Sequence, residues 1–445
     1  MTRRSRLTKV SVVAALVALS TSACLSSSSG GSSGGGTASG NPSGSTVTIW
    51  TSVDQPVMDG LSAQVDSEAQ AMGITVKWSR VDNINQLIMT KIQANDVPDI
   101  AMIPQPGVVK DIVTRGKATS LDNILDMSTL KASMIPGVLD AGTVDGKLYG
   151  VLVSANAKSF VWYPKKAWDA AGWKIPKSIP ELNALTDQIR QSGKGAPWCL
   201  GIESGNATGW PATDWFEDLI LRYGGVQQYN DWVSHKINFD SPLVRQAAAE
   251  FEKIAFTPGN VLGGRKSIAS NAFGTAGNPM FNNPPKCWMY KMGSFITGAD
   301  SGFFPKSVTD NIDSEVGVFA FPPATAGGDT PMLGGGDMAV LLKDSAGSEA
   351  VMKMLADKNV GLKAAGTSSF FSPHKDFDVS LYKGSLAQDW AKIAYGSSSF
   401  NFDGSDAMPG AVGSGSFWKQ MTAWISGQEN LDTALKNIDA SWPSS

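Results

Sequence analysis

Apolar and polar positions alternate in a strand, helix, strand, helix, strand order at the start of the folded part of the chain. Residues 46–50, 74–78 and 99–103 are short runs rich in β-branched and apolar residues, which is typical of strands. Between them, residues 56–72 and 84–94 carry apolar positions at the spacing of amphipathic helices. This order predicts a parallel sheet with crossover helices, and therefore an α/β fold.

The ends of these strands indicate the first candidate binding residues. Ligands of a parallel α/β sheet lie beyond the carboxyl ends of its strands. Asp54 follows the first predicted strand and Gln105 follows the third. We therefore expect both side chains at the edge of a cleft.

Later segments predict a second group of elements. Strands or helices are expected at residues 158–163, 180–190, 210–222, 316–321 and 338–342. Asp145-Gly146 is typical of a tight hairpin turn. Residues 322–336 are rich in Pro and Gly, and we expect Gly335, Gly336 and Asp337 to form an interlobe turn or to let the backbone approach a ligand.

The N-terminus carries a different pattern. Four basic residues within residues 3–9 precede an apolar run at 10–19 that is too short to span a bilayer, and Ala23-Cys24 follows. This arrangement resembles a bacterial lipoprotein signal, in which Cys24 becomes the lipidated first residue of the mature chain. An ordinary signal peptide followed by an unrelated cysteine is the alternative.

A flexible tether is expected after the cysteine. Residues 25–45 are almost entirely Gly, Ser, Thr, Ala, Asn and Pro, and such a segment buries too little apolar surface to order itself. We therefore expect residues 1–23 to be removed as a signal peptide. The protein is then expected at the extracellular face of the cell membrane, anchored through Cys24 alone.

Length, charge and aromatic content narrow the class of protein further. Roughly 420 residues remain after the signal, which indicates two lobes. The mature chain has 33 basic against 40 acidic residues, a net charge of −7 that does not favour a nucleic-acid partner. The 14 tryptophans indicate a large core or a ring-lined cleft, and we expect the core to take more than half of them.

The remaining cysteines and the histidines predict a disulfide and no metal site. Once Cys24 is lipidated, Cys199 and Cys287 are left in an oxidising compartment, where we expect them to pair; two buried free thiols are the alternative. The two histidines lie near no cysteine or carboxylate pair at ligand spacing, so neither zinc nor another cofactor is expected. Residues 259–267 approach a phosphate-loop motif, but Arg265 interrupts it, which favours an ordinary loop.

Asp214 is the most suggestive polar residue because it lies between Trp210 and Trp215. The C–H faces of a sugar pack on indole rings, while sugar hydroxyls donate to a carboxylate. The alternative is a buried tryptophan pair with Asp214 capping a helix. Glu203 is one of several carboxylates that could serve a glycosidase, although the sequence does not show the separation that such a pair needs.

Segments in this order along nearly the whole mature chain carry a family resemblance. They are residues 97–107, 158–163, 197–204, 209–215, Cys287, 335–337, 403–409 and 415–418. They resemble the extracellular solute-binding proteins of ATP-driven carbohydrate importers, and more closely the alpha-glucoside-binding lipoproteins among them. Phe160 departs from the pattern, which has an aliphatic residue there.

The resemblance implies two α/β lobes of the periplasmic-binding-protein-like (Venus flytrap) type with parallel sheets, joined by a hinge that the chain crosses more than once. The N-terminal lobe is expected at 46–155 and 332–365, and the C-terminal lobe at 156–331 and 366–445. A monomer that binds an alpha-glucoside between its lobes and docks on ABC permease subunits follows from the same resemblance. No catalysis is expected. A secreted, lipid-anchored glycoside hydrolase and a structural or adhesion lipoprotein are the alternatives.

The candidate sugar-binding residues combine these arguments. They are Asp54, Gln105, Lys158, Glu203, Trp210, Asp214, Trp215, Gly335, Gly336 and Asp337. If the tryptophans of this set are not part of the site, Lys158, Glu203 and residues 403–418 are the next choice.

Overall fold

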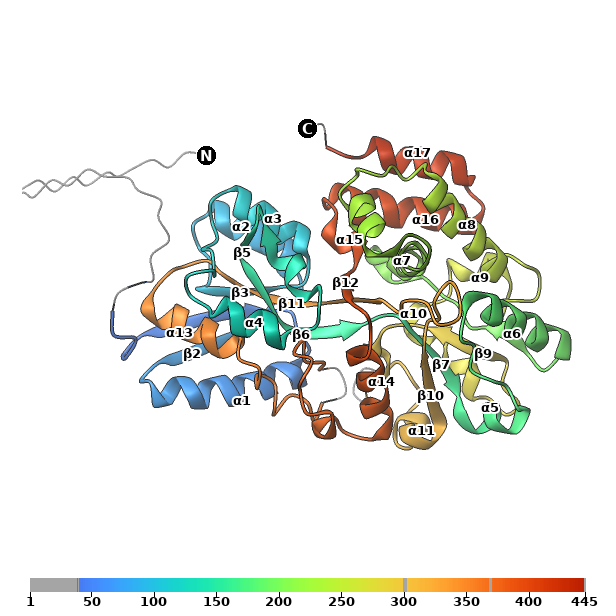
Figure 1. Ribbon diagram of the computed structural model, residues 1–445, viewed down its shortest axis with the longest axis horizontal. Coiled ribbons are helices and arrows are strands. Elements are labelled where there is room, and N and C mark those ends of the chain that lie inside the picture. Colours follow the sequence, from blue (N-terminus) through green and yellow to red (C-terminus); the bar gives the residue numbers. More distant parts are fainter. Residues whose placement is uncertain (1–37, 39, 299–301, 368–369, 444–445) are drawn as a thin grey trace, which may run out of the picture. The chain divides into compact units, whose positions relative to one another are not determined.

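The computed structural model describes residues 38, 40–298, 302–367 and 370–443. The signal, Cys24 and most of the predicted tether lie outside the described residues. Two main β-sheets and a small two-stranded sheet organise the described residues, and helices pack on both main sheets (Figure 1). None of the helices in the described ranges combines the length and the apolar character needed to cross a bilayer.

The first sheet opens with the elements that the sequence predicts. They are β1 (Thr46–Thr51), α1 (Gln55–Ala71), β2 (Thr75–Arg80), α2 (Ile84–Gln93) and β3 (Ile100–Ile103). Strand β1 pairs in parallel with both β2 and β3. Because the two right-handed crossovers run in opposite directions along the sheet, α1 and α2 lie on opposite faces of it (Figure 1). The predicted parallel sheet with crossover helices is confirmed for this part of the chain.

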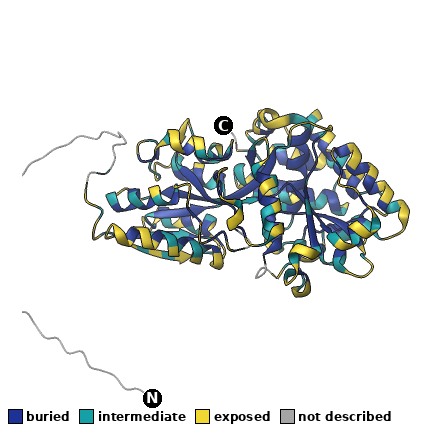
Figure 2. Cartoon of the chain, turned by 60° about the horizontal axis from the view of Figure 1, so that its bottom comes forward, coloured by how far each residue is buried: buried dark blue, intermediate teal, exposed yellow. Residues whose placement is uncertain are grey.

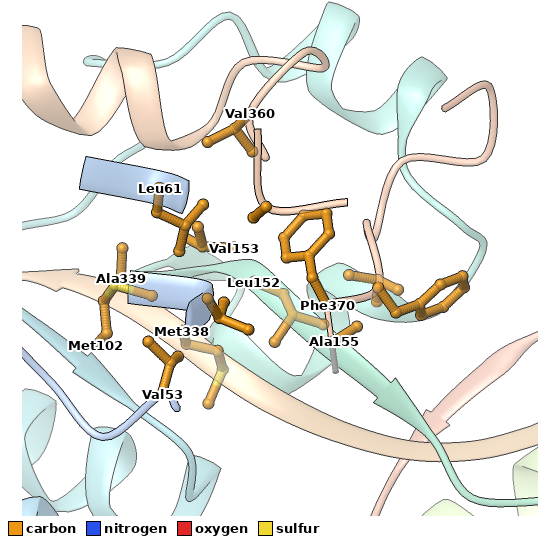
Figure 3. Close-up of a cluster of buried hydrophobic side chains, with 14 of the residues drawn as sticks. Val53, Leu61, Met102, Leu152, Val153, Ala155, Met338, Ala339, Val360 and Phe370 are labelled. Carbon is orange, nitrogen blue, oxygen red and sulfur yellow. The ribbon is translucent and has the colours of Figure 1, made fainter. Parts of the chain in front are cut away.

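Helix α1 shows why this order folds as it does. Its buried residues Val57, Leu61, Val65 and Ala69 recur every four positions, so they form one apolar stripe against the sheet. Figure 3 shows Leu61 beside Val153 of strand β6 (Gly150–Ala157), with Met102 and other buried side chains close by. These contacts bury the stripe in the core of the first lobe.

Strand β11 (Met332–Leu341) corrects the expectation for the glycine run. An interlobe turn was one of the two expectations for Gly335, Gly336 and Asp337, but they lie within this strand, which runs antiparallel to β3 and β6. The physical reason is close packing of backbones: a Cβ at Gly336, whose φ is 144°, would lie 2.2 Å from the carbonyl oxygen of Ser154. Strand β12 (Phe400–Phe402) pairs in parallel with the first residues of β11, Met332 to Gly334.

The second sheet has a mixed topology. Its strand order is β10 (Val316–Ala320), β7 (Phe160–Pro164), β9 (Cys287–Lys291) and β8 (Ala196–Trp198). Only the β8–β9 pair in it is parallel, so the expectation of parallel strands describes the first lobe better than the second. Cys199 and Cys287 form a disulfide beside this pair, which confirms the predicted bridge.

Aromatic side chains fill the core around the second sheet. Nine of the 14 tryptophans are buried, as expected for core residues. Trp215 is one of them, and its ring packs against Trp198, Phe251 and Phe321. Figure 2 shows this buried interior beneath a mixed surface of exposed and intermediate residues.

Three segments cross between the sheets, as the resemblance implies. They join β6 to β7, β10 to β11, and β12 to α15 (Gly404–Ala407). They are bonded to one another: Lys158 N–H donates to Leu333 O at 2.7 Å, and Asp403 N–H donates to Gly334 O at 2.7 Å. Strand β12 belongs to the first sheet, although it falls in a range expected for the C-terminal lobe. The predicted lobe boundaries stay a prediction.

The remaining elements complete both lobes. Their bounds are α3 (Pro106–Thr114), α4 (Met127–Ser133), β4 (Thr143–Val144), β5 (Lys147–Leu148), α5 (Lys165–Ala171), α6 (Ile179–Ser192), α7 (Trp210–Val233), α8 (Pro242–Ala255), α9 (Arg265–Ile268), α10 (Phe273–Ala276), α11 (Lys306–Thr309), α12 (Ile312–Glu315), α13 (Ala346–Leu355), α14 (Ser385–Tyr395), α16 (Trp418–Ser426) and α17 (Leu431–Ala440). Asp145 and Gly146 form the predicted hairpin turn, both with positive φ. Arg265 of the loop 259–267 donates to the carbonyl oxygens of Trp424 and Ile425, which gives that arginine a structural role.

Candidate functional site

A cavity of ≈ 1180 Å³ lies where the edge of the first sheet meets the second lobe. Asp54, Gln55 and Arg80 line it at the carboxyl ends of β1 and β2. Phe295, Phe303 and residues 309–314, which follow β9 of the second sheet, line it as well. The cavity therefore occupies the position beyond the strand ends where a ligand of an α/β sheet is expected.

The lining of the cavity is mixed in chemistry. Asp54 is exposed, whereas Phe295 and Phe303 are only half-buried. Arg80 is held in place, because its Nε donates to Val53 O at 3.1 Å and its Nη1 lies 2.6 Å from Asp82. A cavity with a few fixed polar groups and flat apolar rings suits a neutral polar ligand.

Four half-buried rings form a continuous aromatic patch, made of Trp210, Phe273, Phe295 and Phe303. The ring centroids of Trp210 and Phe273 are 4.8 Å apart, and those of Trp210 and Phe295 are 6.0 Å apart. Trp210 does not line the cavity itself, but the patch links it to the two phenylalanines that do.

Asp337 reaches the same region from the hinge strand. A β-bulge interrupts the β11–β6 pairing between Asp337 and Met338, and Ser52 Oγ donates to Asp337 Oδ1 at 2.9 Å. Burial, together with the nearby charge of Asp54, raises the pKa of Asp337 to about 7, while the Ser52 hydrogen bond works in the opposite direction. Bulges often redirect a side chain next to a functional site.

A buried carboxylate cluster surrounds Lys158, and it consists of Asp214, Glu217, Asp403 and Asp406. Lys158 Nζ lies 3.1 Å from Asp214 Oδ1 and 2.5 Å from Asp403 Oδ2. The same ammonium lies 5.2 Å from the centre of the Trp210 ring. Lys158 is 8% exposed, so this side chain is committed to its protein partners.

The charges of this cluster shift several pKa values. Burial alone would lower the pKa of Lys158, but Asp214, Asp403 and Asp406 raise it well above its usual value. Burial raises the pKa of Asp214 and of Glu217 well above normal. Burial also acts to raise the pKa of Asp403, but Lys158 and Ser405 outweigh it and hold that pKa at about 2. Burial thus opposes ionisation of Asp214 and Glu217, while the Lys158 ammonium favours the ionised form of Asp403.

The cluster does not need a metal ion. Carboxylate oxygens of Asp214, Glu217 and Asp403 lie within 4.8 Å of one another, a spacing that a cation could bridge. Lys158 already binds two of these groups, and both oxygens of Glu217 accept backbone N–H groups of residues 404 and 405. The lysine ammonium thus supplies the positive charge that a cation would bring.

The structure brings only part of the predicted set to the cavity. Asp54 lines it, Asp337 lies beside Asp54, and Trp210 borders it through the aromatic patch. Gly335 and Gly336 are buried in β11, and Glu203 accepts the N–H of Gly205. The remaining members are elsewhere: Lys158 and Asp214 are in the carboxylate cluster, Gln105 contacts Asp406, and Trp215 is in the core.

Sequence reasoning missed most of the residues that line the cavity, among them Arg80, Phe295 and Phe303. Arg80 ends strand β2, so the strand-end argument, applied to the second strand as it was to the first, would have found it. Phe295 and Phe303 lie in segments after β9, and no periodic pattern marks them. Which of these residues contact a ligand stays a prediction.

Comparisons with known proteins agree on one family. The family profile described as bacterial extracellular solute-binding protein matches residues 64–356. The osmoprotective compounds-binding protein GgtB of Synechocystis sp. is 36% identical over 374 residues, which cover 84% of this chain and 87% of that protein. The alpha-glucosides-binding periplasmic protein AglE of Rhizobium meliloti is 33% identical over 416 residues, covering 90% and 88%.

Solved structures show the same fold. The bacterial solute receptor AcbH, described as preferring β-D-galactopyranose, superposes with a TM-score of 0.73 at 16% identity, covering 90% of this chain and 98% of that one. The sugar-binding protein MalE from Xanthomonas citri superposes with a TM-score of 0.66 at 17% identity, covering 89% and 95%. At these identities the likeness concerns the two-lobe fold alone.

Proposed function

The chain belongs to the family of bacterial extracellular solute-binding proteins, and we propose that its ligands are alpha-glucosides, either disaccharides or short oligosaccharides. It is the substrate-binding component of an ABC sugar importer and not an enzyme. The observation that carries the proposal is the ≈ 1180 Å³ cavity with its mixed lining and its adjoining aromatic patch. The alpha-glucosides-binding protein AglE of Rhizobium meliloti, a relative along most of the chain, supports the choice of alpha-glucosides.

The chemistry of the cavity fits a sugar in two respects. Phe295 and Phe303 offer ring faces and edges against which the C–H groups of a pyranose pack. Asp54 offers carboxylate oxygens, which accept hydrogen bonds from sugar hydroxyls more strongly than neutral acceptors do.

Binding is coupled to lobe closure in this proposal. A ligand that touches Asp54 in the first lobe and Phe295 in the second stabilises the closed arrangement of the lobes. The three crossing segments serve as the hinge, and the closed monomer is the form that docks on the permease subunits.

Calorimetric titration with maltose, trehalose and sucrose tests the ligand class. We expect the wild type to bind at least one of these sugars. Phe295→Ala removes a packing face, and Asp54→Asn weakens charge-assisted hydrogen bonds, so each variant is expected to lose affinity by about tenfold.

Trp442→Ala is the matched control for the loss of an aromatic ring. Trp442 is also half-buried, but it stacks on His235 near the C-terminal end of the described chain. This variant should keep the affinity of the wild type. If Phe295→Ala and Asp54→Asn both keep wild-type affinity for a sugar that the wild type binds, the cavity is not the binding site.

We also propose that Cys24 carries the lipid that holds the chain at the membrane. The proposal is supported by the charged, apolar and small-residue order of residues 3–24. Cys24→Ser should move the protein from the membrane fraction to the soluble fraction with sugar binding intact. A Cys24→Ser protein that stays in the membrane fraction would show that another anchor exists.

A further inference from the structure

We propose that the hydrogen bond between Gln105 and Asp406 is an interlobe latch that favours the closed arrangement of the lobes and so sets the affinity for every ligand alike. Gln105 is therefore a positioning residue in this proposal, and not a ligand contact. The part that concerns affinity rests on the proposed sugar-binding function.

The latch joins elements of different lobes. Gln105 precedes helix α3 directly after strand β3 of the first sheet, and Asp406 lies in α15. The Nε2 of Gln105 donates to Oδ1 of Asp406 at 3.0 Å. The backbones approach closely at the same place, because a Cβ at Gly107 would lie 2.6 Å from Met408 O. The contact thus combines a hydrogen bond with close packing.

Each side of the latch is fixed to its own lobe. The two carboxylate oxygens of Glu217, on α7, accept the N–H groups of Gly404 and Ser405 at 2.8 and 3.0 Å. On the other side, α3 buries Val109 and Ile112 in the first core. The Gln105–Asp406 bond therefore connects two firmly anchored segments rather than two mobile side chains.

The position of the latch gives the sign of its effect. Strands β3, β1 and β2 lie side by side in this order, and their carboxyl ends form one edge of the sheet. Gln105 follows β3, while cavity residues Asp54 and Arg80 are at the ends of β1 and β2. Neither Gln105 nor Asp406 is among the described residues that line the cavity. Moving this edge away from the second lobe opens the cavity and breaks the bond.

The charges around Asp406 make the latch sensitive to pH. Asp403, on the same turn, and Lys158, on the hinge crossing, act on the carboxyl group of Asp406. Asp214 and Glu217, both on α7, act in turn on Asp403 and on each other. From the first lobe, the amide of Gln105 donates to Asp406. Burial, followed by the charge of Asp403, raises the pKa of Asp406 to about 7. An ionised carboxylate accepts a stronger hydrogen bond than a neutral acid, so the latch is stronger above pH 7 than below it.

Titration of Gln105→Ala with several sugars distinguishes a latch from a ligand contact. A latch changes only the fraction of closed molecules, so affinity should fall about three- to tenfold by one common factor for maltose, trehalose and sucrose. A residue that touches the ligand would instead give factors that differ between the sugars, and that result would overturn the proposal.

Gln227→Ala is the matched control. Gln227 donates to Asp231 at 3.1 Å, so it makes the same kind of amide–carboxylate bond, but within helix α7 of a single lobe. Its loss should leave both affinity and lobe separation unchanged.

Lobe separation without sugar gives a readout that does not depend on the proposed function. Spin labels on one exposed position of each lobe should report a longer mean distance in Gln105→Ala than in wild type and in Gln227→Ala. Unchanged distances would refute the latch even if the protein binds sugars. If the wild type binds none of the sugars, the proposed ligand class fails, whereas the distance measurement still decides the latch.

Asp406→Asn is the second variant, and the pH dependence of sugar binding is its test. Wild-type affinity should fall between pH 8 and pH 6 as Asp406 takes up its proton, while Asp406→Asn should show a weaker dependence and a lower affinity at pH 8. An Asp406→Asn profile as steep as that of the wild type would assign the titration to another group.

Discussion

Lys158 shows at the scale of single residues how burial decides a role. From the sequence, Lys158 was a candidate sugar contact. In the structure its ammonium lies between the carboxyl groups of Asp214 and Asp403. Removing one partner of a buried ion pair is costly, because the remaining charge is left without compensation. The lysine therefore stabilises the hinge more directly than it serves a ligand.

Lys158→Met should lower the free energy of unfolding by about 3–5 kcal/mol, because two buried carboxylates lose their counter-charge. Urea unfolding at pH 7.5, followed by tryptophan fluorescence, measures the change. Lys306→Met is the control: Lys306 pairs with Asp310 on the surface, where such a pair contributes less than about 1 kcal/mol. Equal stability of the two variants would contradict a structural role for Lys158.

Trp210 and Trp215 show why two similar residues can have different surroundings. Five positions on a helix correspond to a rotation of about 140°, so the two rings of α7 point to different sides. Trp210 is half-buried in the aromatic patch, while Trp215 is only 2% exposed in the core. Helical geometry, once the helix start is known, separates the candidate contact from the core residue.

Strand β11 carries the main lesson at the scale of elements. Its glycines suggested a turn, because glycine is common in turns and rare within strands. The strand tolerates them because it runs between β3 and β6 in the hinge region, where the backbones approach closely. The need for close approach only becomes visible once the neighbouring strands are placed.

Gly336→Ala should therefore destabilise the protein by at least about 2 kcal/mol, since its Cβ would meet Ser154 O at 2.2 Å and its φ of 144° is unfavourable for alanine. Gly335→Ala is the adjacent control, because the nearest atom to its Cβ is 3.4 Å away. Thermal unfolding of both variants should show a clear loss of Tm only for Gly336→Ala. Similar Tm values would mean that the strand can shift to accept the methyl group.

At the scale of the whole molecule, buried carboxyl groups make stability depend on pH. Burial and Asp54 raise the pKa of Asp337 to about 7, so the folded chain keeps a proton that the unfolded chain loses near pH 4. The contribution of Asp337 to the free energy of unfolding therefore declines as the pH rises from about 4 to about 7. Above pH 7 it is constant.

Asp337→Asn removes this titration and keeps an oxygen for the hydrogen bond from Ser52. The variant should gain stability relative to wild type as the pH rises from 4 to 7, by a few kcal/mol at most. Urea unfolding across this pH range measures the difference. Asp59→Asn, which changes an exposed carboxylate on α1, should give a curve parallel to that of the wild type. A constant difference between Asp337→Asn and wild type would rule out the linkage.

The sequence by itself determined the local elements and the class of the protein. The spacing of apolar residues in 46–103 was sufficient to predict strands β1 to β3 and the helices α1 and α2 between them. Each of these elements has one clearly apolar face or run. The number of cysteines was sufficient to predict the Cys199–Cys287 disulfide. The family predicted from the resemblance is the family whose profile matches the chain.

Tertiary structure alone decided which polar and aromatic side chains meet. Phe295 and Arg80 are 215 residues apart in the sequence but line one cavity, and Gln105 meets Asp406 across 301 positions. Periodicity describes only the faces of single elements, whereas these contacts depend on how the lobes are joined by the three crossings. Lys158, Asp214 and Asp403 likewise became a buried ion cluster only because the hinge brings three distant segments together in the interior, where charges must pair.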